Sequence, residues 1–145
     1  THGVRVVLLR TGIVLDRSGP LAQMLPPFKM FVGGPIAGGR QFMSWIHIED
    51  EVGLILHALD QTEISGPLNA TAPQPLSNKD FSGILGKVLG RPSFLPTPGF
   101  ALRIMLGEGA QIITTGQRVL PKKALASGYV FKHPELEGAL RNILA

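Results

Sequence analysis

The sequence predicts an α/β fold, and three stretches of the chain support that class. Residues 4–9 form a nearly continuous apolar run, which is typical of a parallel strand buried on both faces. A glycine-rich loop at 33–39 leads into an aromatic and β-branched segment at 42–48, which we expect to be a strand followed by an amphipathic helix. A further strand predicted at 66–71 precedes a helix with a recognisable N-cap.

The predicted first strand, residues 4–9, is too apolar for an edge exposed to water, and the chain hardly supplies the neighbours that would cover it. We therefore expect the chain to be a fragment of a larger protein. The strand ends at Arg10, Thr11 and Gly12. Because ligands of open α/β sheets bind beyond the carboxyl ends of strands, this triplet is well placed to contact one.

The following stretch is short and rich in turn residues. Residues 13–15 are a second apolar run, and residues 16–20 have the composition of a turn. Within 21–31, Pro26 and Pro27 lack backbone N–H donors, so we predict one short helix that ends before them.

The loop at 33–39 contains four glycines, which suit either a ligand-facing loop or a tightly packed one. Arg40 stands at the exit of this loop. Either Glu49 or Asp50 is predicted to cap the helix that follows the strand. The apolar positions of that helix recur at helical spacing and are predicted to face the core: Val52, Ile55, Leu56 and Leu59.

The helix predicted after residue 77 carries the clearest local signal in the chain. Ser77 and Asp80 form a near capping box, and Gly90 followed by Pro92 is predicted to end the helix. Its predicted inward face is Phe81, Ile84, Leu85, Val88 and Leu89.

The composition changes after residue 90. Three prolines between residues 92 and 98 predict an extended connection, after which a helix runs to a stop at Gly107. Residues 108–119 are ambiguous between helix and irregular structure, because they include a β-branched run. Residues 121–126 and the stretch after Pro134 are predicted to be helical.

Composition argues against several functional classes. The chain has 14 Lys and Arg against 10 Asp and Glu, with a single adjacent basic pair at 122–123, so nucleic-acid binding is not supported. The lack of cysteine excludes thiol-based metal sites and favours a reducing compartment, so we expect a cytoplasmic protein. No apolar run approaches the roughly 20 residues that cross a membrane as a helix.

Several motifs, in the right order, resemble the second half of an extended short-chain dehydrogenase/reductase. More closely, they resemble the subgroup called epimerase family proteins. The motifs lie at residues 8–15, 24–28, 33–36, 39–41 and 45–50. The tail, with its motifs at 107–108 and 116–121, resembles the small domain of unknown function attached to that subgroup.

The resemblance implies a Rossmann-type NAD(P)-binding protein with a substrate-binding subdomain. Residues 1–90 would be the C-terminal part of that region, and residues 91–145 a small, mostly helical domain. This sequence has neither the family's Gly-x-x-Gly-x-x-Gly cofactor loop nor its Tyr-x-x-x-Lys pair, since Tyr129 is followed by Lys132 at the wrong spacing. We therefore expect no catalytic residue in this chain.

The same resemblance implies NAD or NADP as the cofactor of the full-length protein, and an N-terminal half as a partner of this chain. By analogy, Arg10, Thr11 and Gly12 are the cofactor-binding candidates. A salt bridge or a cap at a strand end would explain the first two equally well. Homo-oligomerisation stays open.

The substrate-binding candidates are Arg40, Trp45 and His47. Arg40 could bind a phosphate or carboxylate through its planar guanidinium, or form a surface ion pair. Trp45 could stack on a substrate ring, although a core position is the commoner role. His47 is more often a hydrogen-bonded structural residue than an acid or base. We expect Arg10 and Arg40 to converge on one pocket.

Two further expectations concern the remaining polar residues. Arg118 and Lys122 could help to bind an anionic ligand, or could be solvated surface charges. His2, His57 and His133 lack the mutual spacing of a metal site, so no metal is predicted.

Two functions follow from the sequence. In the first, the chain is the substrate-side portion of an NAD(P)-dependent epimerase or oxidoreductase of the nucleoside-sugar type, active only when joined to its N-terminal half. In the second, the chain is a non-catalytic interaction module on an inherited scaffold. Whether the chain serves an enzyme is left open, because fold analogy does not establish chemistry.

Overall fold

The structure is a computed structural model that describes residues 3–36, 38–96 and 116–145. Its strands are β1 (Val7–Thr11), β2 (Ile13–Leu15), β3 (Phe42–Met43), β4 (Trp45–His47), β5 (Gly66–Ala70) and β6 (Leu76–Ser77). Its helices are α1 (Gly19–Lys29), α2 (Ile48–Asp60), α3 (Asn78–Leu89), α6 (Lys122–Ala126) and α7 (Leu136–Leu144). Among these described helices, none is both long and apolar enough to cross a membrane.

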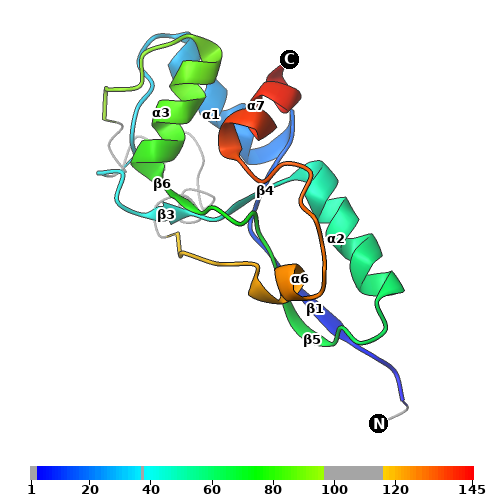
Figure 1. Cartoon of the computed structure of the whole chain (residues 1–145). Helices are drawn as coiled ribbons and strands as arrows, with labels where there is room; N and C mark the ends of the chain where they lie inside the picture. The colour runs from blue at the N-terminus through cyan, green and yellow to red at the C-terminus, as the bar shows by residue number, and fades with distance from the viewer. Residues whose placement is uncertain (1–2, 37, 97–115) are drawn as a thin grey trace.

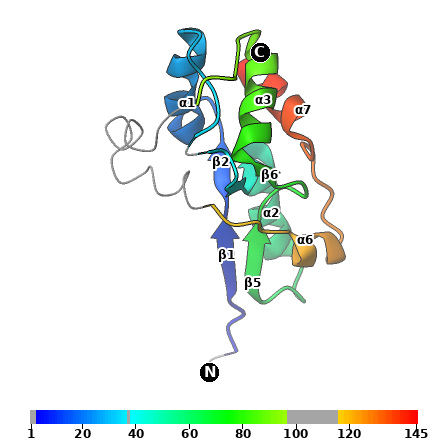
Figure 2. The same ribbon diagram turned by 90° about the vertical axis from the view of Figure 1, so that its left-hand side faces the viewer.

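The strands form three pairs. β1 and β5 are parallel, with Val7 opposite Gly66 and Thr11 opposite Ala70, and Figure 2 shows them side by side. β2 and β4 are also parallel, whereas β3 and β6 are antiparallel. Parallel strands joined through helices confirm the predicted α/β class.

Gly12 joins β1, which pairs with β5, to β2, which pairs with β4. Its N–H donates to the Ala70 carbonyl, and the N–H of Ile13 donates to the Ser44 carbonyl. A Cβ at position 12 would lie 2.5 Å from the Ser44 carbonyl oxygen, so the close approach requires glycine.

The described residues pack into two apolar clusters, one at each end of the molecule. In Figure 1, α1, α3 and α7 gather at one end, whereas β1, β5, α2 and α6 lie at the other. Trp45 and Phe81 belong to the first cluster, and Ile46 and Leu68 to the second. α7 packs on α3 and α6 packs on β5, so both late helices rest on elements of the first ninety residues. The division into domains at residue 90 stays a prediction.

The predictions for α3 and α7 are confirmed. The Ser77 hydroxyl accepts a hydrogen bond from the Asp80 N–H at 3.2 Å, and Gly90 ends α3 with a left-handed φ of 65°. The buried face of α7 is apolar: Leu136, Ala139, Leu140 and Ile143. The predicted α6 is present, and the helix predicted between residues 98 and 107 lies outside the described residues.

The prediction that a short helix ends before Pro26 is wrong. α1 begins at Gly19 and continues through both prolines to Lys29. Leu21, Met24 and Phe28 are buried on one face of this helix. The free energy gained by burying these side chains therefore outweighs the loss of backbone hydrogen bonds at the two prolines.

The strand predicted at 42–48 is interrupted, and the helix after it is capped differently from the prediction. Ser44 separates β3 from β4. The N-cap of α2 is His47, whose Nδ1 accepts from the Glu49 N–H at 3.0 Å, rather than Glu49 or Asp50. The carboxylate of Asp50 accepts hydrogen bonds from the backbone of Lys132 and His133. Nδ1 of His47 replaces the side-chain oxygen that usually caps a helix.

The predicted inward face of α2 is also wrong. The face that contacts the rest of the chain carries Asp50, Glu51, Leu54 and Ala58. The predicted apolar positions are between 42% and 66% exposed: Val52, Ile55, Leu56 and Leu59. The packed face is therefore mixed, with two carboxylates, and the more apolar face of α2 is exposed in this chain.

Candidate functional site

A cleft lies where the parallel strands β1 and β5 end. It has a volume of about 590 Å³, and one wall is formed by Arg10, Thr11, Gly12, Asn69 and Thr71. The other wall, which we call the C-terminal wall, consists of residues 117–120 with Lys122. The three residues predicted to bind a cofactor therefore share one cleft at the carboxyl ends of strands, where ligands of such sheets bind. Their assignment to the cofactor stays a prediction.

The C-terminal wall is held against the strand ends by side chains. The Ser44 hydroxyl donates to the Gln117 carbonyl at 2.6 Å and accepts from the Val119 N–H at 2.9 Å. The Asn69 amide donates to the Leu120 carbonyl at 3.2 Å, and the Thr71 hydroxyl makes a longer contact with the Val119 carbonyl. The sequence did not reveal this pairing, because residues 117–122 are far from β1 and β5 in the chain.

Thr11 is oriented by a buried carboxyl group beneath it. Its hydroxyl donates to Oε1 of Glu51 at 2.8 Å, and Glu51 is only 8% exposed. The other oxygen, Oε2, has no hydrogen-bond partner among the described residues. Since the Thr11 hydrogen is used in this bond, the hydroxyl oxygen can face a ligand in the cleft only as an acceptor.

We expect Glu51→Gln to change how stability depends on pH. Burial raises the pKa of Glu51 above its ordinary value of 4.5, and the hydrogen bond from Thr11 only partly opposes that rise. The folded chain thus binds this proton more tightly than the unfolded chain, and the associated stability is lost as pH rises from 4.5 through the folded-state pKa.

Urea unfolding between about pH 4 and about pH 7 measures this effect. Relative to the parent, Glu51→Gln should gain stability as the pH rises, because the variant lacks the group whose ionisation is disfavoured. Glu63→Gln, at an exposed position, is the matched control and should follow the parent at every pH. If the free energy of unfolding of Glu51→Gln and of the parent changed with pH in the same way, the expectation would be contradicted.

The three predicted substrate-binding residues do not share this cleft. Arg40 is exposed and is not among the described residues that line it, so the expectation that Arg10 and Arg40 converge on one pocket is not met. Trp45 is fully buried, and its indole N–H donates to the Gln74 carbonyl at 3.0 Å. His47 is 2% exposed. A role for these residues in substrate binding stays a prediction.

The glycine loop packs tightly where the structure describes it. A Cβ on Gly34 would overlap the Leu95 carbonyl, and one on Gly33 would meet the Phe28 ring. Of the two roles predicted for the loop, close packing accounts for these two positions.

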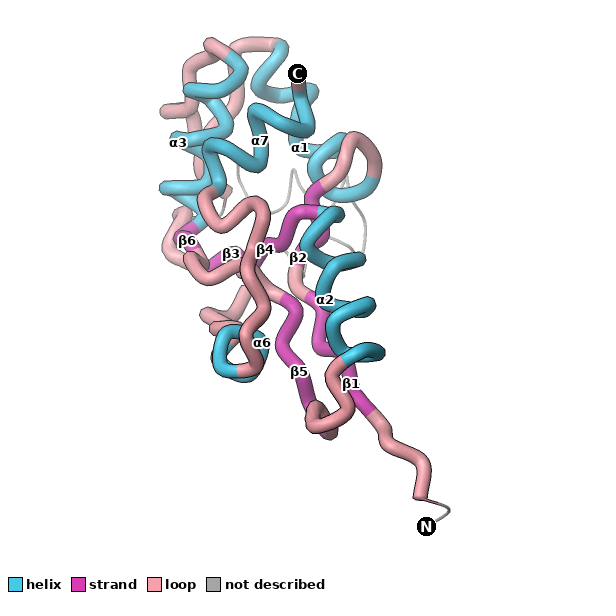
Figure 3. The backbone as a smooth tube through the Cα atoms, turned by 45° about the vertical axis from the view of Figure 1, so that its right-hand side comes forward, coloured by secondary structure: helices cyan, strands magenta, loops and turns pink. Residues whose placement is uncertain are grey.

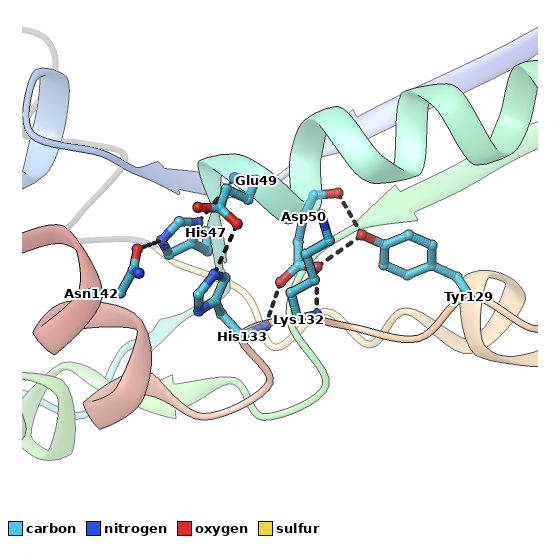
Figure 4. Close-up of polar contacts among 7 residues, drawn as sticks. All are labelled: His47, Glu49, Asp50, Tyr129, Lys132, His133 and Asn142. Carbon is cyan, nitrogen blue, oxygen red and sulfur yellow. Dashed lines mark hydrogen bonds and ion pairs between the residues drawn. The ribbon is translucent and has the colours of Figure 1, made fainter.

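Asp50 fastens the end of the chain to α2, as Figure 4 shows. Its buried carboxylate accepts from the Tyr129 hydroxyl at 2.8 Å and from the N–H groups of Lys132 and His133 at 2.8 and 2.9 Å. Burial raises the pKa of Tyr129, as do the hydrogen bond and the charge of Asp50, so the phenol stays protonated as a donor. Asp50 was predicted to cap the helix, but its carboxylate instead holds residues 129–133 against α2.

His47 and His133 meet beside Asp50, a pairing that the sequence did not predict. Their rings are stacked with centroids 3.7 Å apart, and Nε2 of His133 lies 3.3 Å from Oε2 of Glu49. Because Nδ1 of His47 accepts from the Glu49 N–H, its Nε2 donates to Asn142 at 2.9 Å. The ligand atoms of His47, Glu49 and His133 lie within 4.8 Å of one another, as a metal site would require. However, lone pairs in nearly parallel rings do not converge on one ion, so the geometry fits a hydrogen-bonded cluster better.

Comparison with known proteins identifies the tail and the whole chain separately. Residues 97–143 match the family model described as "Domain of unknown function (DUF1731)". Over 142 residues the chain is 48% identical to the chloroplastic epimerase family protein SDR39U1 homolog of Arabidopsis thaliana, covering 97% of this chain and 41% of that protein. It is 45% identical over 143 residues to the epimerase family protein YfhF of Bacillus subtilis, covering 99% of this chain and 47% of that protein.

A solved structure agrees with these matches. The human epimerase family protein SDR39U1, crystallised with NADPH, superposes with a TM-score of 0.87 at 41% identity, covering 96% of this chain and 48% of that chain. The chain thus spans about half the length of the relatives it matches. The resemblance predicted from the motifs is confirmed, and so is the Rossmann-type fold class. This chain belongs to the epimerase family proteins of the extended short-chain dehydrogenase/reductase type, and it corresponds to their C-terminal part.

Proposed function

We propose that this chain forms the substrate side of an NAD(P)-dependent epimerase or oxidoreductase, and that it acts together with a nucleotide-binding polypeptide. The cleft at the ends of β1 and β5 is the observation that supports the proposal, since ligands of open α/β sheets bind there. Arg10, Asn69 and Lys122 give the cleft donors and positive charge, which suit a dinucleotide or a phosphorylated substrate. A nicotinamide cofactor, when bound, supplies hydride transfer.

An exposed apolar surface supports the need for a second polypeptide. Among the described strands β1 pairs only with β5, so its other edge has no described partner. α2 runs alongside β1 in Figure 3, and its exposed apolar face includes Ile55 and Leu59. An apolar pocket of about 250 Å³ lies between the two elements and is lined by Val7 and Leu9 of β1 and by the same two α2 residues. Apolar patches of this kind mark protein interfaces, and we call this one the β1/α2 face.

The proposal is tested by combining the chain with the half of the Bacillus subtilis relative that it does not match. The two should co-purify, and the complex should bind NADPH in a fluorescence titration. The double variant Ile55→Lys/Leu59→Lys should weaken association by at least about 100-fold, because it places two charges in an apolar interface. Both positions are exposed in the chain alone, so the variant should still fold.

A matched control places the same charges at the other end of the molecule. Met30 and Phe94 are 70% and 75% exposed, and Met30→Lys/Phe94→Lys should leave association unchanged. A complex that forms but binds neither NADPH nor NADH would reject the proposed function. That result would favour the alternative, a non-catalytic interaction module that uses the β1/α2 face.

A further inference from the structure

We propose that the C-terminal wall of the cleft binds an anionic group of the substrate, a phosphate or a carboxylate, through Arg118 and Lys122. The assignment to a substrate rests on the proposed function, whereas the anion site itself can be tested without it. The proposal gives a role to residues that lie within the matched domain of unknown function.

The charge of the cleft supports an anion. Three cations line it, namely Arg10, Arg118 and Lys122, and no Asp or Glu is among its described lining residues. None of the three forms an ion pair with another described residue. Like charges that share a cleft without a neutralising partner raise the local concentration of an anion.

Arg118 keeps its donors available for such a ligand. Its guanidinium carbon lies 5.8 Å from the centre of the Phe42 ring, within range of a cation–π contact. An interaction with the ring face uses the charge of the guanidinium and leaves its planar set of N–H groups for an oxygen ligand. Lys122, at the start of α6, adds a second, flexible cation to the same wall.

The backbone between these two cations is fixed in place. Ser44, only 8% exposed, bonds both the Gln117 carbonyl and the Val119 N–H, the groups on either side of Arg118. Asn69 holds the Leu120 carbonyl just before α6. A binding site needs side chains on a rigid backbone, and these bonds supply one for a segment without regular structure. Ser44 is therefore a positioning residue of the site.

The test is a calorimetric titration of the 145-residue chain with inorganic phosphate and, separately, with succinate. Binding of one probe identifies the anion class. The double variant Arg118→Gln/Lys122→Gln should weaken that binding by at least about tenfold, the loss expected for two charge-assisted contacts. The control Lys29→Gln/Lys132→Gln removes two exposed cations outside the cleft, so the net charge falls equally and binding should stay within about twofold.

Two further measurements separate the alternatives. Ser44→Ala should also weaken anion binding while the Arg118 and Lys122 side chains are intact, and circular dichroism confirms that each variant is folded. The proposal is overturned if neither probe binds, or if the cleft variant binds as tightly as the control. It is also overturned if saturating NADPH displaces phosphate from the complex, because the anion site would then belong to the cofactor. Failure of the complex to bind NADPH would reject the proposed function alone.

Discussion

Replacing Asp50 with alanine is expected to lower the free energy of unfolding by about 3–5 kcal/mol. The fully buried carboxylate accepts three hydrogen bonds, from the Tyr129 hydroxyl and from the backbone of Lys132 and His133. Without it, all three donors lose a charged acceptor in a place that water reaches poorly. A buried donor left unpaired typically costs about 1–3 kcal/mol, so this loss is among the largest a single substitution can cause here.

Urea unfolding measures the loss, and hydrogen exchange locates it. The amides of Lys132 and His133 should exchange faster in Asp50→Ala, since both are bonded to the missing carboxylate. Asp60→Asn, at an exposed position of the same helix, is the control and should change stability by less than about 0.5 kcal/mol. Unchanged exchange at both amides would show that Asp50 does not hold the tail.

Trp45→Ala is expected to cost about 3–5 kcal/mol, the usual range for removing a large buried aromatic side chain. Trp45 is fully buried in the cluster formed with α1, α3 and α7, so alanine would leave a cavity among their side chains. The Gln74 carbonyl would also lose the indole donor. Trp45→Phe should cost less, because the ring still fills part of the space while the hydrogen bond is lost.

The same variants decide between the two predicted roles of Trp45. Phe94→Ala, at an aromatic residue that is 75% exposed, provides the control and should leave stability nearly unchanged. If Trp45→Phe were as stable as the parent but bound substrate poorly in the complex, the stacking role would be favoured over the core role. A large loss of stability with Trp45→Ala supports the core role.

The structure brings together the candidate residues at the strand end but does not place Arg40 with them, and the binding roles of all four stay predictions. The sequence predicted that the first strand ends before Arg10, whereas β1 continues through Thr11. Arg10, Thr11 and Gly12 nevertheless lie at the carboxyl end of this strand, where a general rule about open sheets places a ligand cleft. Arg40 was grouped with them only by its position after a glycine loop, and it lies outside that cleft. The family resemblance named the fold correctly, because several motifs in fixed order carry information that no single motif has.

The second wall of the cleft could not be predicted in the same way. Arg118 and Lys122 looked equally like solvated charges, since nothing in their neighbourhood showed what they face. The bonds that bring them to the strand ends come from Ser44, Asn69 and Thr71. Ser44 and Val119 are 75 residues apart, a separation at which no local pattern operates.

By itself, the sequence determined the elements that depend on neighbouring residues. The cap of α3 joins Ser77 to Asp80, and its end depends on the left-handed backbone that Gly90 adopts easily, so both could be predicted from a few residues. Only the tertiary structure decided which side of α2 meets the core. Periodicity shows which residues share a face of a helix and would bury the more apolar face of α2, but the partners that select the buried face come from distant parts of the chain. Thr11 donates a hydrogen bond to Glu51, and Tyr129 donates one to Asp50. The face that carries these two carboxylates can be buried because each of them finds a donor there.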